Sequence, residues 1–235
     1  MTPDLSIVVL AYNEEENVEP VIDELGGWLD QHLPDVRVEI LVVDDGSTDE
    51  TRAAAARALA EREGTVLVHP ANRGMGAGLK TGVRAARGAW VTFLPADGQI
   101  DPAAIQTLWN ARTDADVVLS VYEDRDDGAA RRVLSWGVRA LILAVHGVRM
   151  HSDGPYLFRR TLFDASQLEP DTFFLNFEFP IRVLRAGLRT ATVTISCRPR
   201  RAGVSKTARL SRVLDVGRDL VDLRRRRFRE ALRRL

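Results

Sequence analysis

The sequence is poor in cysteine, in recognisable leader segments and in long apolar runs. Its single cysteine, Cys197, excludes an internal disulfide and a cysteine-based metal cluster, and is compatible with a reducing compartment. Met1 is followed by Thr-Pro-Asp, with no basic region before an apolar segment, which argues against a signal peptide. Apolar runs such as Leu141 to Val145 fall far short of the roughly 18 residues that span a bilayer. These absences predict a cytoplasmic protein without a transmembrane helix.

Histidine is also scarce, and its distribution does not suggest a metal site. None of the four histidines has metal-ligand spacing with another: His32, His69, His146 and His151. We therefore expect structural or surface roles for them, and a small core residue at Cys197.

The chain lacks net charge, but its charges are unevenly distributed. Residues 198–235 hold 14 Lys/Arg and 4 Asp/Glu, a net of +10, so the rest of the chain carries −10. Such asymmetry indicates an anionic partner for the basic end. Nucleic acid, a membrane surface and a phosphorylated substrate all fit this charge.

Apolar strands and amphipathic helices alternate along the chain with short connections. This order predicts an α/β fold with a mostly parallel sheet flanked by helices. The expected strands cover residues 5–11, 38–43, 65–68, 89–94, 116–121 and 190–197, with a short strand near 154–158. The expected helices cover residues 18–29, 50–62, about 75–86, 102–112, 131–145, 178–186 and 210–235.

Acidic residues follow several of the predicted strands at the point where each strand ends. They are Glu14, Asp44, Asp45 and Asp97, accompanied by Tyr12. Parallel strands bring these ends to one edge of the sheet, where open α/β sheets bind ligands. An aromatic ring and carboxylates for a nucleoside, with a metal-bound carboxylate beside its diphosphate, suit a nucleotide site. The alternative is ordinary turn chemistry, with Ser47 or Thr48 capping one helix and Asp101 another.

A glycine-rich stretch opens the third predicted helix. Gly74, Gly76 and Gly78 follow the third strand and are spaced Gly-x-Gly-x-Gly. A dinucleotide fingerprint follows the first strand and reads Gly-x-Gly-x-x-Gly, so a Rossmann dehydrogenase is disfavoured. Small residues here favour close approach of a donor to the loop.

The order of these motifs resembles the family 2 inverting glycosyltransferases. The motifs are Val-Val-Leu-Ala-Tyr-Asn-Glu-Glu-Glu-Asn, Val-Val-Asp-Asp-Gly-Ser-Thr-Asp-Glu-Thr, Asn-Arg-Gly-Met-Gly-Ala-Gly and Pro-Ala-Asp-Gly-Gln. Within the family the chain looks like the dolichyl-phosphate and polyprenyl-phosphate sugar synthases, because Arg200 to Lys206 is similar to their Arg-x-x-Gly-x-Ser-Lys loop. The resemblance implies a GT-A (Rossmann-like) fold, a nucleotide-sugar donor and a Mg²⁺ or Mn²⁺ ion.

The resemblance also assigns site residues. For the donor it implies Ala11, Tyr12, Glu14, Asp44, Asp45, Gly74, Lys80, Ala96 and Asp97, with the nucleoside on Tyr12, Glu14 and either Asp44 or Asp45. For the metal and the diphosphate it implies Asp97 and Gln99. For the acceptor phosphate it implies Ser135, Arg200, Ser205 and Lys206, and it adds Arg131, Arg132 and Glu178 to the catalytic set.

Three positions depart from the family pattern. Pro95 stands where the metal motif Asp-x-Asp has its first acid, so metal binding rests mainly on Asp97. Val121 and Tyr156 stand where the family has arginines on the sugar and acceptor side. These departures leave the donor sugar and the lipid more open than the reaction class.

The basic end is expected to form a separate element. We divide the chain into a glycosyltransferase domain, 1–207, and a basic amphipathic helical tail, 208–235. The first half of this tail can pack on the domain or form an oligomer contact. Its second half favours a membrane surface over nucleic acid, because no aromatic-interleaved basic platform for bases is present. A homo-oligomer and a separate membrane-anchor partner are both left open.

The resulting hypothesis is sugar transfer, with inversion, from GDP-mannose or a UDP-hexose to a polyprenyl or dolichyl phosphate at the cytoplasmic face of a membrane. A lipid phosphate is already ionised near neutral pH and needs no general base. A hydroxyl acceptor would need one, for which Asp153 or Glu178 is the candidate. A third hypothesis is a catalytically silent nucleotide-sugar-binding protein, because Pro95 has replaced one acid.

Overall fold

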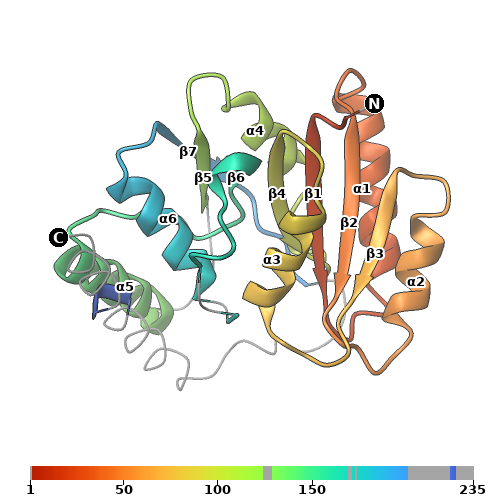
Figure 1. Cartoon of the computed structure of the whole chain (residues 1–235), viewed down its shortest axis with the longest axis horizontal. Coiled ribbons are helices and arrows are strands. Elements are labelled where there is room, and N and C mark those ends of the chain that lie inside the picture. Colours follow the sequence, from red (N-terminus) through yellow and green to blue (C-terminus); the bar gives the residue numbers. More distant parts are fainter. Residues whose placement is uncertain (1, 124–128, 169–170, 173, 201–222, 226–235) are drawn as a thin grey trace.

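The computed structural model describes residues 2–123, 129–168, 171–172, 174–200 and 223–225, with the backbone alone over 129–136. Strands and helices alternate through this part of the chain (Figure 1). The strands are β1 (Leu5–Ala11), β2 (Val38–Asp44), β3 (Gly64–Val68), β4 (Trp90–Pro95), β5 (Val117–Tyr122), β6 (Leu157–Arg159) and β7 (Thr190–Ile195). The helices are α1 (Val18–His32), α2 (Thr51–Ala58), α3 (Met75–Ala85), α4 (Ala103–Asn110), α5 (Ala129–His146), the 3₁₀ turn η1 (Arg160–Leu162) and α6 (Leu175–Arg185).

The strands form one sheet in the order β3-β2-β1-β4-β6-β5-β7. All of its pairings are parallel except those of β6, which runs antiparallel to β4 and β5. The predicted mostly parallel α/β sheet is therefore confirmed. β1 lies centrally because its sequence is apolar on both faces, as a buried parallel strand requires.

Two apolar layers cover the two faces of the sheet. On one face, Ile7 and Val9 of β1 pack with apolar residues of α1, α2 and α4. On the other face, Val8 packs with residues of α3 and α6, next to an aromatic cluster that includes Tyr156 and Phe158. α5 lies at the end of the molecule beside α6 and far from β3 (Figure 1).

The predicted start and end of α2 were wrong. The helix begins at Thr51, where the backbone N–H donates to the carboxylate of Asp49, so neither Ser47 nor Thr48 caps it. It ends at Ala58, and the chain then turns into β3, where Gly64 lies so close to the carbonyl oxygen of Ile40 that a Cβ would be 2.5 Å from that oxygen. The carboxylate of Asp101, in contrast, accepts the backbone N–H of Ala103 at the start of α4, at 2.9 Å.

The basic tail lies mostly outside the described residues, so its predicted helix and the boundary at residue 207 stay predictions. Leu223 is described, and it is buried with Ile142 of α5 and Ile181 of α6. The guanidinium of Arg224 donates to the carbonyl oxygen of Val145 at 2.6 Å. At this point the tail packs on the domain. No helix in the described part of the chain is long and apolar enough to cross a membrane.

Candidate active site

The carboxyl ends of β1, β2 and β4 meet at one edge of the sheet. Ala11 is the pairing partner of Asp44, and the backbone N–H of Asp45 donates to the carbonyl oxygen of Ala11 at 2.9 Å. On the other side of β1, the N–H of Ala96 donates to the carbonyl oxygen of Leu10 at 2.9 Å. The predicted convergence of the strand ends is therefore present in the fold.

The turns after β1 and β2 are joined by hydrogen bonds. Asn13 has a positive φ of 52°, a conformation that asparagine tolerates better than most residues. Its N–H donates to Ser47 Oγ at 2.9 Å, and its side-chain oxygen accepts the N–H of Thr48 at 2.8 Å. The N–H of Glu14 donates to Thr51 Oγ1 at 2.8 Å. These bonds hold Tyr12 and Glu14, the chain neighbours of Asn13, next to the turn that follows β2.

The two neighbouring aspartates of β2 have different surroundings. Asp44 is buried, and its Oδ1 accepts the N–H of Ser47 at 2.9 Å. Asp45 accepts the backbone N–H groups of Arg73 and Gly74 at 2.9 and 2.8 Å, and its Oδ1 lies 2.6 Å from Nδ1 of His69. Asp45 therefore shapes the turn that leads into α3, and the assignment of either aspartate to a nucleoside stays a prediction.

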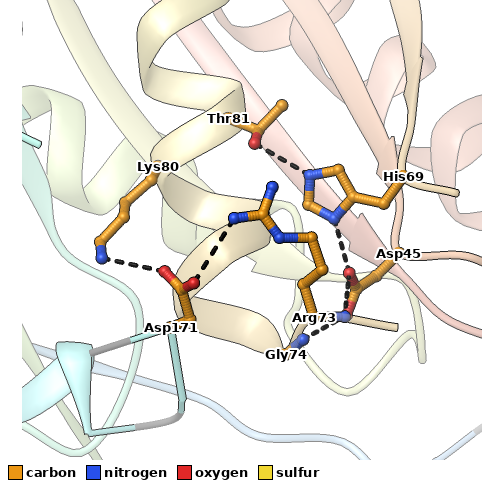
Figure 2. A network of polar contacts seen from close by, with 7 residues as sticks. All are labelled: Asp45, His69, Arg73, Gly74, Lys80, Thr81 and Asp171. Atoms are coloured by element: carbon orange, nitrogen blue, oxygen red, sulfur yellow. Dashed lines mark hydrogen bonds and ion pairs between the residues drawn. The ribbon is translucent and has the colours of Figure 1, made fainter. Parts of the chain in front are cut away.

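His69, expected to have a structural or surface role, lies buried beside Asp45. It follows β3 at the same sheet edge, and its Nε2 lies 2.9 Å from Oγ1 of Thr81 in α3 (Figure 2). A carboxylate can only accept a hydrogen bond, so the contact with Asp45 is a bond that Nδ1 of His69 donates. Its position directly after the third strand was the available signal, because the acidic residues at the other strand ends were identified from such positions.

A cationic corner at the start of α3 is occupied by Asp171. Lys80 is buried, and its Nζ lies 3.0 Å from Oδ1 of Asp171, while the guanidinium of Arg73 lies 3.5 Å from Oδ2 (Figure 2). The carbonyl oxygen of Asp171 also accepts the N–H of Ala77 in the first turn of α3, at 3.0 Å. Burial would raise the pKa of Asp171, but the hydrogen bond and charge of Lys80, together with Arg73, hold it below its ordinary value. Neither Asp171 nor Arg73 was identified from the sequence.

Gly74 allows the backbone of Asp171 to lie close to the start of α3. Its φ is 95°, and a Cβ at this position would lie 2.7 Å from the carbonyl oxygen of Asp171. Glycine meets both demands because it lacks a Cβ.

Asp97 follows β4 and is largely buried. Its Oδ1 accepts the N–H of Gln99 at 3.1 Å. Burial raises the pKa of Asp97 above its ordinary value, and the nearby charge of Glu14 adds to the rise, while the Gln99 N–H and the charge of Arg200 oppose it. Ionised Asp97 therefore favours a cation beside it.

Arg200 reaches the same corner from the C-terminal side. One of its guanidinium nitrogens forms an ion pair with Glu14, and the other lies 3.9 Å from Oδ2 of Asp97. Two residues earlier, Arg198 forms ion pairs with Glu24 at 2.6 Å and Asp101 at 2.5 Å. The basic segment thus begins beside Asp97, and its role in binding phosphate stays a prediction.

A divalent cation fits this corner with few protein ligands. No cluster of three or more His, Cys, Asp or Glu side chains suited to a metal occurs among the described residues. Mg²⁺ and similar hard cations need only one or two carboxylates when substrate phosphates and water complete the shell. Asp97 offers one carboxylate, and its Oδ2 has Arg200 only at 3.9 Å, beyond hydrogen-bonding distance. Asp97 and the donor diphosphate are therefore a chemically suitable set.

The remaining predicted residues lie elsewhere or outside the described part. The carboxylate of Glu178 is fully buried in α6, where its Oε1 pairs with Arg182 at 2.7 Å. This is the geometry of a structural ion pair, so a role in proton transfer stays a prediction. Arg131, Arg132 and Ser135 lie on α5, where only the backbone is described, and Ser205 and Lys206 lie outside the described residues.

Comparison with known proteins identifies the family. Residues 6–184 match the model of glycosyl transferase family 2, and the chain belongs to this family. Over 157 residues it is 32% identical to the dodecaprenyl-phosphate galacturonate synthase of Rhizobium johnstonii, covering 64% of this chain and 46% of that protein. It is 29% identical to the dolichyl-phosphate beta-glucosyltransferase of Drosophila melanogaster, covering 92% of this chain and 73% of that protein.

The chain spans less than two thirds of several relatives. It covers 36% of the glycosyltransferase AglD of Haloferax volcanii, to which it is 27% identical over 91% of its own length. Among solved structures, glucosyl-3-phosphoglycerate synthase from Mycobacterium tuberculosis superimposes with a TM-score of 0.69 at 24% identity, over 94% of this chain and 78% of that one. That crystal structure contains Mn²⁺, uridine diphosphate and glucosyl-3-phosphoglycerate. The likeness confirms the GT-A fold.

Proposed function

We propose that this protein transfers a sugar, with inversion, from a nucleotide-sugar donor to a polyprenyl phosphate. The observation that carries the proposal is the meeting of the acidic strand ends with Arg200 of the basic segment at Asp97. We assign donor and acceptor chemistry to this one corner of the sheet. The names of the dodecaprenyl-phosphate and dolichyl-phosphate relatives support the choice of acceptor.

The donor nucleoside would lie over the ends of β1 and β2. Tyr12 supplies an aromatic ring, and Asp44 supplies a buried carboxylate for ribose hydroxyls or base N–H groups. The carboxylate of Asp45 accepts the backbone N–H of Gly74, so Asp45 would act on the donor indirectly, by positioning this turn. Lys80 and the start of α3 supply positive charge on the same side.

Asp97 and Gln99 would hold the metal and the diphosphate. A bound Mg²⁺ or Mn²⁺ would neutralise charge on the departing nucleoside diphosphate. Asp97 anchors this cation from the end of β4, and Glu14 adds negative charge beside it. Which of the two cations serves is part of the proposal to be tested.

The acceptor phosphate would attack the anomeric carbon without help from a base, because it is already ionised. Arginine and lysine side chains would instead hold its oxygens by charge-assisted hydrogen bonds. Arg200 is described at the site, and we assign the same task to Arg131, Arg132, Ser135, Ser205 and Lys206. A peripheral position at the cytoplasmic face of the membrane, reached through the basic tail, completes the proposal.

The test is a two-phase transfer assay. The protein is incubated with Mn²⁺ or Mg²⁺, polyprenyl phosphate and labelled UDP-glucose, UDP-galacturonate or GDP-mannose, and the product is partitioned between water and organic solvent. Label in the organic phase that depends on both the lipid phosphate and the metal supports the proposal. Water-soluble product alone indicates a hydroxyl acceptor, and donor binding without turnover indicates a silent binding protein; either result contradicts the proposal.

A further inference from the structure

Arg200 occupies a position between the two carboxylates of the metal corner. It pairs with Oε1 of Glu14 through Nη2, while its Nη1 lies 3.9 Å from Oδ2 of Asp97. The side chains are 18% exposed for Arg200, 9% for Glu14 and 12% for Asp97. Two carboxylates this close together in a buried corner need a cation between them, and here the protein supplies its own.

Glu14 is held in place independently of Arg200. Its Oε2 accepts a hydrogen bond from Nδ2 of Asn17 at 2.6 Å, and its backbone N–H donates to Thr51. The position of the Glu14 carboxylate therefore does not depend on Arg200 alone.

The segment that carries Arg200 is anchored two residues earlier. Arg198 pairs with Glu24 and Asp101, and its backbone N–H donates to the carbonyl oxygen of Gln99 at 2.8 Å. Cys197 forms an isolated β-bridge with Ile100. The anchor fixes the backbone beside the β4–α4 turn, so the long Arg200 side chain can change partners without detachment of the segment.

The geometry points to Arg200 as an exchangeable internal counter-cation. When a divalent cation reaches Asp97, the guanidinium of Arg200, now 3.9 Å from Oδ2, moves away because two positive charges cannot share this carboxylate favourably. Its released guanidinium then pairs with phosphate oxygens of the acceptor. This inference rests on the proposed function, and it adds that metal loading and acceptor binding are coupled through one side chain.

Coupling of this kind is reciprocal. A phosphate that draws Arg200 away from Asp97 strengthens metal binding, and metal binding makes Arg200 available for a phosphate.

The test measures Mn²⁺ binding without donor, by electron paramagnetic resonance of the free ion. Arg200→Gln is expected to lower the Kd for Mn²⁺ by about 5-fold or more, within the usual range of coupling between sites. Arg200→Lys keeps the charge and is expected to restore a Kd near that of the unmodified protein. Arg57→Gln is the matched control, because it removes one positive charge from an exposed pair with Glu19.

A Kd that is unchanged or higher in Arg200→Gln overturns the inference. If the unmodified protein binds no Mn²⁺, Arg200→Gln must gain measurable binding, and failure to do so also overturns it. Farnesyl phosphate should lower the Kd of the unmodified protein but not that of Arg200→Gln. Because Mn²⁺ binding needs no turnover, this result is separable from the transfer assay: normal exchange without lipid product contradicts the proposed function alone.

Discussion

His69 and Asp45 are joined by a buried contact of 2.6 Å between Nδ1 and Oδ1, at the point where the second and third strands end. The same carboxylate holds the backbone of Arg73 and Gly74, so the pair connects the sheet edge to the start of α3. A histidine outside every recognised motif thereby helps to shape the turn to which we assign the donor.

His69→Leu should weaken both the fold and donor binding. The substitution removes a hydrogen bond to a buried charged group, for which we expect a loss of about 1.5–3 kcal/mol in the free energy of unfolding. Nucleoside diphosphate binding should weaken too, because the turn at Gly74 loses its support. Urea denaturation and calorimetry measure the two effects. The exposed His151→Leu is the control and should change stability by no more than about 0.5 kcal/mol; equal effects of the two substitutions would remove His69 from this role.

Gly74→Ala should destabilise the protein by about 1–3 kcal/mol, since a residue other than glycine is strained at a φ of 95°. The added Cβ would also press on the carbonyl oxygen of Asp171. Gly27→Ala is the matched control, because a Cβ there meets nothing within 4 Å in α1. That helical substitution should stabilise by about 0.5–1 kcal/mol. We expect urea denaturation to show a lower free energy of unfolding for Gly74→Ala and a higher one for Gly27→Ala. A Gly74→Ala variant of unchanged stability would contradict the contact with Asp171.

Asp97→Asn should weaken metal-dependent nucleotide binding without lowering the stability of the protein. Metal-dependent binding of UDP and GDP should weaken by at least about 10–100-fold, since loss of an outer-shell partner alone has that effect. The free energy of unfolding at pH 7 should not fall. The folded-state pKa of Asp97 is raised by burial, so its ionised form opposes folding and asparagine removes this cost. Asp30→Asn, in an exposed pair with Arg62, is the control. Unchanged metal-dependent affinity would remove Asp97 from the metal site.

Asp171 should contribute to stability in a pH-dependent way. Its pKa is lower in the folded state than its ordinary value because of Lys80 and Arg73, although burial opposes this. The folded state therefore gains stability above the unfolded-state pKa and loses it as pH falls through the folded-state pKa. Asp171→Asn should flatten the acid side of the stability curve, measured by urea denaturation from pH 3 to 7. A variant curve parallel to that of the unmodified protein would contradict the contact.

Much of the fold could be predicted because the signals were local. β1 was predicted with its observed limits, since a continuous apolar run bounded by turn residues defines a buried strand. The strand ends with Asp44 and Asp97 could be located for the same reason. The end of α2 was predicted too far along the chain, because the helix-forming residues continue to Arg62 although the helix ends at Ala58.

The contacts that complete the site depend on tertiary structure. Asp171 reaches Lys80 across 91 positions of sequence, and Arg198 reaches Glu24 across 174. Hydrophobic periodicity carries no information about such pairs. The resemblance to a family placed Arg200 in the site, but its position between Glu14 and Asp97 required the fold.

The most direct test of the account is lipid-linked product formation by the unmodified protein and by Asp97→Asn, assayed side by side with Mn²⁺, labelled nucleotide sugar and polyprenyl phosphate. We expect label in the organic phase for the unmodified protein, lost when the metal is chelated and lost in the variant. Equal amounts of organic-phase product from the two proteins would contradict this assignment. So would label that stays entirely in the water phase with both proteins.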